Sequence, residues 1–184
     1  MMVHRRKLLG YAAGAAGLSV FGTRAAASAP AGSLAGSTAR SIALTNLHTG
    51  ESLKATYWEA GQYVPDALSA LNHVLRDHRT GEVHAIAPSL FDLVTALQGK
   101  LETHTTVSVI SGYRSPATNA ALHAHSEGVA SHSLHMEGEA MDLRIAGVDL
   151  DRIRDAALSL QRGGVGYYPQ SQFVHVDVGR VRCW

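Results

Sequence analysis

Three side chains of the kind that bind metal ions restrict the folds open to this sequence, because they can meet only if distant segments come together. They are His135, Asp142 and His175. Two imidazoles and one carboxylate form a common ligand set of catalytic zinc, which keeps a further position open. In a continuous helix His135 and Asp142 would lie roughly 10 Å apart along the axis, at about 1.5 Å per residue. The chain must therefore fold back between them, and Gly138 is free to adopt the backbone angles that this requires.

The segments that carry Asp142 and His175 both have the pattern of β-strands. Residues 140–145 follow the Gly138 loop, and residues 173–178 are rich in alternating β-branched side chains. The other predicted elements are a hairpin of 41–47 and 52–58, helices from Pro65 and from Pro88, strands 106–110 and 163–168, and helices 117–123 and 150–160. No regular series of strand, helix and strand is present. The sequence therefore predicts a single α+β domain with a mainly antiparallel sheet flanked by helices.

The first residues have the pattern of an export signal. Arg5 and Arg6 form a twin arginine, and residues 8–21 form a weakly apolar stretch rich in glycine and alanine. This stretch is shorter than the ~20 residues that span a bilayer, which argues against the alternative of an N-terminal membrane anchor. Small residues follow, where a signal peptidase can cut. We predict a twin-arginine signal peptide at 1–29, a linker at 30–39, and a domain at 40–184 that is exported to the periplasm without a lasting membrane span.

Composition excludes some classes of partner. The formal net charge is +1, and the chain has neither a basic stripe nor interleaved aromatic residues. Nucleic acid is therefore not an expected partner. Cys183 is the only cysteine, so the chain cannot form an internal disulfide even in a compartment that permits one.

The spacing of these residues resembles a known family. Ser133-x-His135-x-x-Gly138-x-Ala140-x-Asp142, with His175 downstream, is similar to the signature of the D-Ala-D-Ala carboxypeptidases and endopeptidases of the LAS (hedgehog-type) zinc peptidase fold. Further segments resemble the twin-arginine-exported endopeptidases of this family, in the same order and over the whole mature chain. They are residues 47–51, 75–82, 111–115, 163–169 and 173–177.

The resemblance implies a set of site residues. One Zn²⁺ per chain would be held by His135, Asp142 and His175, with water completing the site. Arg114 would act in catalysis as the electrophilic or substrate-orienting group, since a planar guanidinium suits the carboxylates of peptidoglycan stem peptides. The alternative for Arg114 is an ordinary salt bridge in a loop.

Two more residues are predicted to bind substrate. Tyr113 precedes the candidate arginine and is expected in the core or in the wall of the cleft. Ser133 begins the histidine motif and is expected to form hydrogen bonds within the metal-binding loop.

The sequence departs from the family in the residue that handles protons. Many members have an acid three residues before the last metal-binding histidine, or a histidine two residues before it. This chain has Gln172 and Phe173 there, and neither is a base near neutral pH. Asp177 is the predicted substitute, because it shares a strand face with that histidine. It acts either as the general base or as an acceptor that orients a ligand imidazole. Glu137 and Glu139 are weaker candidates.

These observations favour a zinc-dependent murein endopeptidase that hydrolyses peptide cross-links of peptidoglycan with metal-activated water. Cross-links between two diaminopimelate residues and between D-Ala and diaminopimelate both remain open. The alternative is a catalytically impaired, metal-containing module that binds the cell wall, and Gln172 is its main support. An iron oxygenase triad beginning at His175 and Asp177 would need another histidine downstream, and none follows.

Overall fold

The computed structural model describes residues 39–125 and 130–184. The predicted signal peptide (1–29) and all but the last residue of the predicted linker (30–39) lie outside the described residues. Those described all belong to one compact unit. No helix within them is long and apolar enough to cross a membrane.

The predicted elements are present, with small shifts at their ends. The strands are β1 (Arg40–Asn46), β2 (Ser52–Glu59), β3 (Gln62–Tyr63), β4 (Val107–Ser111), β5 (Ala140–Ile145), β6 (Gly164–Tyr168), β7 (Phe173–Asp177) and β8 (Arg182–Cys183). The helices are α1 (Pro65–Val74), α2 (Pro88–Lys100), α3 (Pro116–His125), the 3₁₀ helix η1 (Leu134–Glu137) and α4 (Leu150–Leu160). Pro65 and Pro88 each stand at the first turn of a helix, where the absent N–H leaves no bond unmade.

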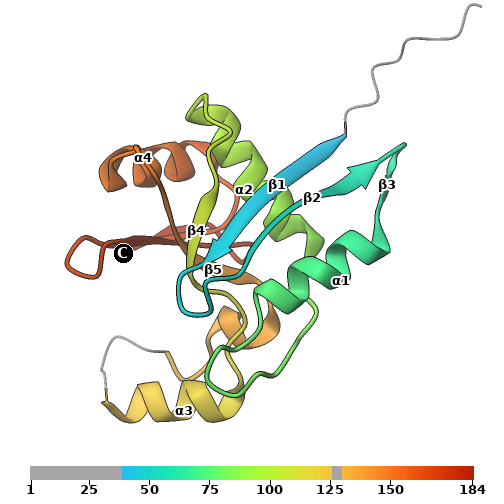
Figure 1. Cartoon of the computed structure of the whole chain (residues 1–184). Helices are drawn as coiled ribbons and strands as arrows, with labels where there is room; N and C mark the ends of the chain where they lie inside the picture. The colour runs from blue at the N-terminus through green and yellow to red at the C-terminus, as the bar shows by residue number, and fades with distance from the viewer. Residues whose placement is uncertain (1–38, 126–129) are drawn as a thin grey trace, which may run out of the picture. The chain divides into compact units, whose positions relative to one another are not determined.

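All the strands belong to one sheet in the order β3-β2-β1-β4-β5-β7-β6-β8 (Figure 1). The pairs β1–β4 and β6–β8 are parallel, and the other neighbours are antiparallel. The predicted α+β class and mainly antiparallel sheet are therefore confirmed. The two-residue strands β3 and β8 were not predicted.

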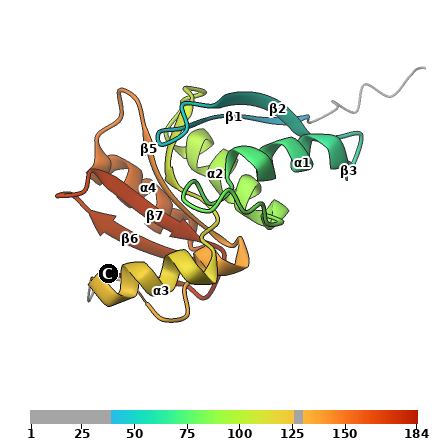
Figure 2. The same cartoon turned by 60° about the horizontal axis from the view of Figure 1, so that its bottom comes forward.

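Helices α2 and α4 contact each other and cover one face of the sheet. Residues that alternate along β5 and β7 point into this core, and all are almost fully buried: Met141, Leu143, Ile145, Val174 and Val176. Burial of one such aliphatic side chain contributes roughly 1.5–3 kcal/mol. The helix α3 stands apart from α2 and α4 in both views (Figure 2).

The same alternation places the polar side chains on the other face of the sheet. Asp142 on β5 and His175 and Asp177 on β7 lie between the core residues in sequence, so they point away from the helices. The register sets Asp142 directly opposite His175. The apolar core of the sheet therefore holds two of the predicted ligands as cross-strand neighbours.

Candidate metal centre

His135 reaches this pair from η1, just before β5. The 3₁₀ helix ends at Gly138, which has a left-handed backbone with φ of 70°. A Cβ at this position would also collide with the carbonyl oxygen of Ala85, so glycine is required for two reasons. The chain turns here and enters β5, which brings His135 over Asp142.

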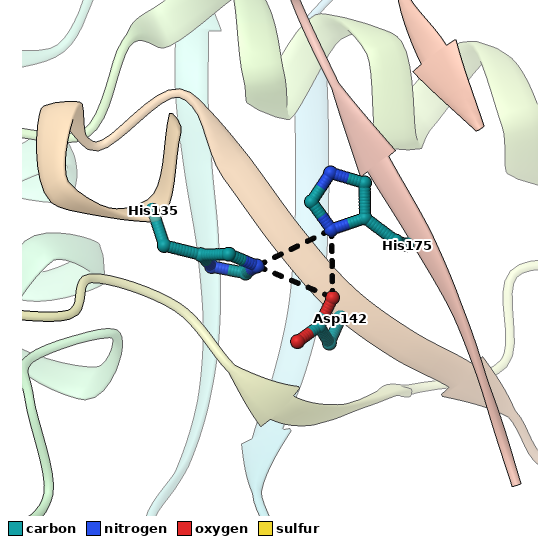
Figure 3. A group of neighbouring side chains, drawn as sticks. All are labelled: His135, Asp142 and His175. Atoms are coloured by element: carbon teal, nitrogen blue, oxygen red, sulfur yellow. Dashed lines mark hydrogen bonds and ion pairs between the residues drawn. The ribbon is translucent and has the colours of Figure 1, made fainter. Parts of the chain in front are cut away.

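The three predicted ligands converge on one point (Figure 3). The Nε2 atom of His135 lies 3.2 Å from Oδ1 of Asp142 and 3.3 Å from Nδ1 of His175. The same Oδ1 lies 2.8 Å from Nδ1 of His175. All three residues are buried, with exposed fractions of 2%, 6% and 8% for His135, Asp142 and His175.

In each imidazole, one nitrogen faces the other two ligands and the second nitrogen points away from them. The hydrogen-bond partner of the second nitrogen determines whether the first is protonated. Nδ1 of His135 lies 2.7 Å from the carbonyl oxygen of Gly112, which can only accept, so this nitrogen carries the proton. Nε2 of His175 lies 3.1 Å from a carboxylate oxygen of Asp177 and is the donor there. Each ring therefore turns an unprotonated nitrogen toward the other and toward Asp142. This is the orientation that partners of the second nitrogen give to metal-binding histidines.

When both rings are neutral, three acceptors thus face one another, and a cation, either a second proton on His175 or a metal ion, completes the group. Burial raises the pKa of Asp142, but His135 and His175 outweigh it and hold that pKa well below its usual range, so the carboxylate is ionised. Burial lowers the pKa of His175, but hydrogen bonds from the protonated ring to Asp142 and Asp177 outweigh it and raise that pKa, so a second proton on Nδ1 competes with a metal ion for this position. Two imidazole nitrogens and one carboxylate oxygen fit a catalytic zinc site.

Asp177 is fully buried behind His175 and accepts several hydrogen bonds. Besides His175 it accepts from Arg182, at 2.7 and 3.1 Å, and from the backbone N–H groups of Gly164 and Gly179, each at 2.9 Å. Burial raises the pKa of Asp177, but these hydrogen bonds outweigh it and hold that pKa well below its usual range. Of the two roles predicted for Asp177, the geometry favours orientation of a ligand imidazole.

Arg114 lies beside the ligands in the loop between β4 and α3. Its backbone N–H donates to the carbonyl of His135 at 3.0 Å, and Nη2 lies 3.7 Å from Oδ2 of Asp142. The hydrogen bonds to Asn119 and Ser111 are long, at 3.4 and 3.5 Å, and Nε is buried with no partner among the described residues. The guanidinium is therefore placed at the site with donors that the protein itself uses poorly.

Of the other predicted site residues, Ser133 lines the cleft, whereas Tyr113 and Glu137 do not. Ser133 lines the cleft at the start of η1, where its side chain makes no capping hydrogen bond. Tyr113 is buried, stacks on His84 and donates its hydroxyl to Glu82 at 2.8 Å. It is not among the residues that line the cleft. Exposed Glu137 is also absent from that lining.

The ligands stand at the base of a cleft of about 500 Å³. Its lining residues are Arg114, Ala130, His132, Ser133, Leu134, His135, Asp142, Tyr168, Ser171, Phe173, His175, Arg182 and Trp184. Tyr168, Arg182 and Trp184 were not predicted as site residues. Gln172, at the position where the family resemblance led us to expect an acid, is exposed in the turn, and its side-chain amide donates to the carbonyl of Pro169. Asp177 lies on the far side of His175, so the alternative iron triad is not formed.

A buried group of two histidines and one aspartate that lines an open cleft could hold a metal ion of the hydrolytic type. The family described as peptidoglycan L,D-endopeptidase MepK (Peptidase_M15_2) matches residues 34–184. The chain belongs to this family.

Known relatives match over the length of the chain. The peptidoglycan L,D-endopeptidase MepK of Escherichia coli (strain K12) is 47% identical over 98% of this chain and 97% of its own length. The probable peptidoglycan L,D-endopeptidase MepK of Haemophilus influenzae is 44% identical over 79% of this chain and 78% of its own length. Among solved structures, the L-Ala D-Glu endopeptidase ChiX of Serratia marcescens has 22% identity and a TM-score of 0.35, covering 52% of this chain and 69% of its own. Family membership rests on the sequence matches.

Proposed function

We propose that this chain is a zinc-dependent murein endopeptidase that hydrolyses peptide cross-links of peptidoglycan. The observation that carries the proposal is the convergence of Nε2 of His135, Nδ1 of His175 and Oδ1 of Asp142, which lie between 2.8 and 3.3 Å from one another. The sequence matches add the substrate, because relatives similar over most of the chain are named peptidoglycan L,D-endopeptidases. We accordingly assign an L,D peptide bond within a cross-link as the bond that is cut, and an extracytoplasmic place of action.

The residues of the site have separate tasks in this reaction. His135, Asp142 and His175 would hold zinc, which when bound supplies a Lewis acid that lowers the pKa of water and polarises a carbonyl group. Asp177 keeps the proton of His175 on Nε2, so that Nδ1 always faces inward. Arg114 offers its Nη groups, which make only long hydrogen bonds within the protein, to a carboxylate of the stem peptide and so orients the scissile bond.

One observation favours the alternative of a cell-wall-binding module with impaired catalysis. Among the described residues that line the cleft, the only one with a carboxylate side chain is the candidate ligand Asp142. A base of the kind found in many relatives is therefore not contributed by an acid in this wall. Binding of intact peptidoglycan without cleavage would support this alternative.

Digestion of purified, cross-linked muropeptides tests the proposed function. The zinc-loaded mature chain should release uncross-linked peptides, identified by mass spectrometry, and a chelator should stop the release until zinc is restored. Arg114→Ala should lower kcat/KM by about 100-fold while zinc content stays unchanged, because one charged, bidentate contact to substrate is lost.

Arg144→Ala provides the matched control. This arginine lies on the same strand as Asp142 but is exposed and does not line the cleft. The Arg144→Ala variant should cleave cross-linked muropeptides with the kcat/KM of the wild type. Intact cross-links after prolonged digestion by the zinc-loaded wild type would overturn the endopeptidase assignment.

We also propose export by the twin-arginine route. Replacement of Arg5 and Arg6 by lysine should leave uncleaved precursor in the cytoplasm, because a receptor reads this signal and not hydrophobicity alone. Cell fractionation and immunoblotting measure the outcome, with Lys7→Arg as the matched control. Normal periplasmic accumulation of the double variant would indicate the general secretory route.

A further inference from the structure

One wall of the cleft is aromatic and takes no part in the metal site. It consists of Tyr168, Phe173 and Trp184, which we call the aromatic wall. Tyr168 ends β6 and Phe173 begins β7, and their rings stack across the two strands with centroids 4.6 Å apart. Trp184 follows β8 and extends this surface toward His175, at a centroid distance of 5.2 Å.

The sheet itself positions Trp184. Its backbone N–H donates to the carbonyl of Val165 at 3.2 Å, and its carbonyl accepts from the N–H of Tyr167 at 3.1 Å. The residue between these two partners is Gly166, where a Cβ would lie only 2.7 Å from the indole. The glycine thus leaves the space that the indole ring occupies beside β6.

The indole is also held by side chains. Its Nε1–H donates to the hydroxyl of Tyr168 at 2.7 Å, and the guanidinium of Arg182 lies 4.9 Å from its ring centroid. Trp184 nevertheless remains 50% exposed. A large ring that is fixed on several sides and open on another loses little conformational freedom when a ligand packs on it.

We propose that Trp184 is a substrate-contacting residue that determines how the stem peptide lies across His175, a proposal that rests on the proposed function. Stem peptides carry methyl and methylene groups, which pack on an apolar aromatic face through dispersion and release of water. The three side chains of the aromatic wall are uncharged, whereas Arg114 in the same cleft suits a carboxylate. The peptide is therefore held at two chemically different points.

Fluorescence tests the contact without relying on hydrolysis. The chain has two tryptophans, Trp58 and Trp184, so Trp58→Phe leaves the cleft indole as the only one. A purified disaccharide-tetrapeptide should change the emission of zinc-loaded Trp58→Phe saturably, because it covers the exposed face. Trp184→Phe, which retains only the remote indole, should show no change. An unchanged emission of Trp58→Phe at concentrations up to several times the KM of the wild type, or up to millimolar if no KM is measurable, would overturn the contact.

Kinetics on cross-linked muropeptide test the consequence. Trp184→Ala should raise KM by about 10-fold, the scale of one lost aromatic contact, with zinc content unchanged. Trp184→Phe should recover most of this loss. Trp58→Ala is the matched control, because Trp58 also contacts an arginine and an aromatic ring but lies away from the cleft.

Two results would overturn the role of Trp184. A kcat/KM of Trp184→Ala within about twofold of the wild type would remove the contact from substrate recognition. Loss of zinc from Trp184→Ala would show that the indole supports His175 and does not bind substrate. If the wild type cleaves no cross-link, the proposed function fails, and the fluorescence titration still decides whether Trp184 contacts the peptide.

Discussion

Replacement of His135, Asp142 or His175 by alanine should remove bound zinc and abolish hydrolysis of cross-linked muropeptides. Each variant leaves only two of the three converging ligands, and a structural or catalytic zinc site needs at least three protein ligands. Metal analysis after dialysis should give about one zinc per chain for the wild type and much less for each variant.

His104→Ala is the control for this experiment, because His104 is an exposed histidine outside the cleft and should leave zinc and activity unchanged. Thermal unfolding separates loss of metal from loss of fold. Zinc should raise the Tm of the wild type, because a ligand that binds only the folded state stabilises it, and it should not raise the Tm of the variants. Stoichiometric zinc in all three dialysed variants would refute the site.

Local patterns were sufficient to predict most elements of this fold. The predicted helix 150–160 coincides with α4, and the predicted strand 140–145 coincides with β5. Both have a clear apolar period, which depends only on neighbours along the chain. The convergence of His135, Asp142 and His175 was also predicted, because ligand chemistry requires residues distant in sequence to meet.

Local sequence patterns do not predict which distant strands pair with each other. Strand β1 pairs in parallel with β4, and β6 pairs in parallel with β8. Nothing in the sequence of either strand of a pair indicates its partner. The position of Trp184 depends on the second of these contacts and on the space left at Gly166. The aromatic wall could therefore not be inferred from spacing.

Tyr113 illustrates the same limit at one residue. It follows β4 in a loop, where the alternation of a strand no longer indicates which way a side chain points. The neighbouring Gly112 packs closely on Leu75, and the backbone N–H of Tyr113 donates to the Leu75 carbonyl at 2.8 Å. This tertiary contact turns the ring toward Glu82 and leaves Arg114 as the residue that faces the cleft.

The second large effect is expected at Asp177. A catalytic base works best when its pKa lies near the working pH, and hydrogen bonds hold the pKa of this carboxylate well below its usual range. Asp177→Asn should weaken zinc binding by roughly 10-fold or more, because the amide is a poorer acceptor for the proton on Nε2 of His175. Activity should return when zinc is added in excess. Titration with a competing chelator and assays at increasing zinc measure the two effects.

Glu137→Gln is the matched control, because it makes the same change in an exposed acid of η1 beside His135. Both its zinc affinity and its activity should equal those of the wild type. If Asp177→Asn keeps its zinc but turns over at least about 100-fold more slowly, Asp177 transfers protons and does not merely orient His175. If it is both zinc-replete and fully active, Asp177 has no part in the mechanism. Its hydrogen bonds from Gly164, Gly179 and Arg182 would then serve only to join β7 to β6, to the turn after β7 and to β8.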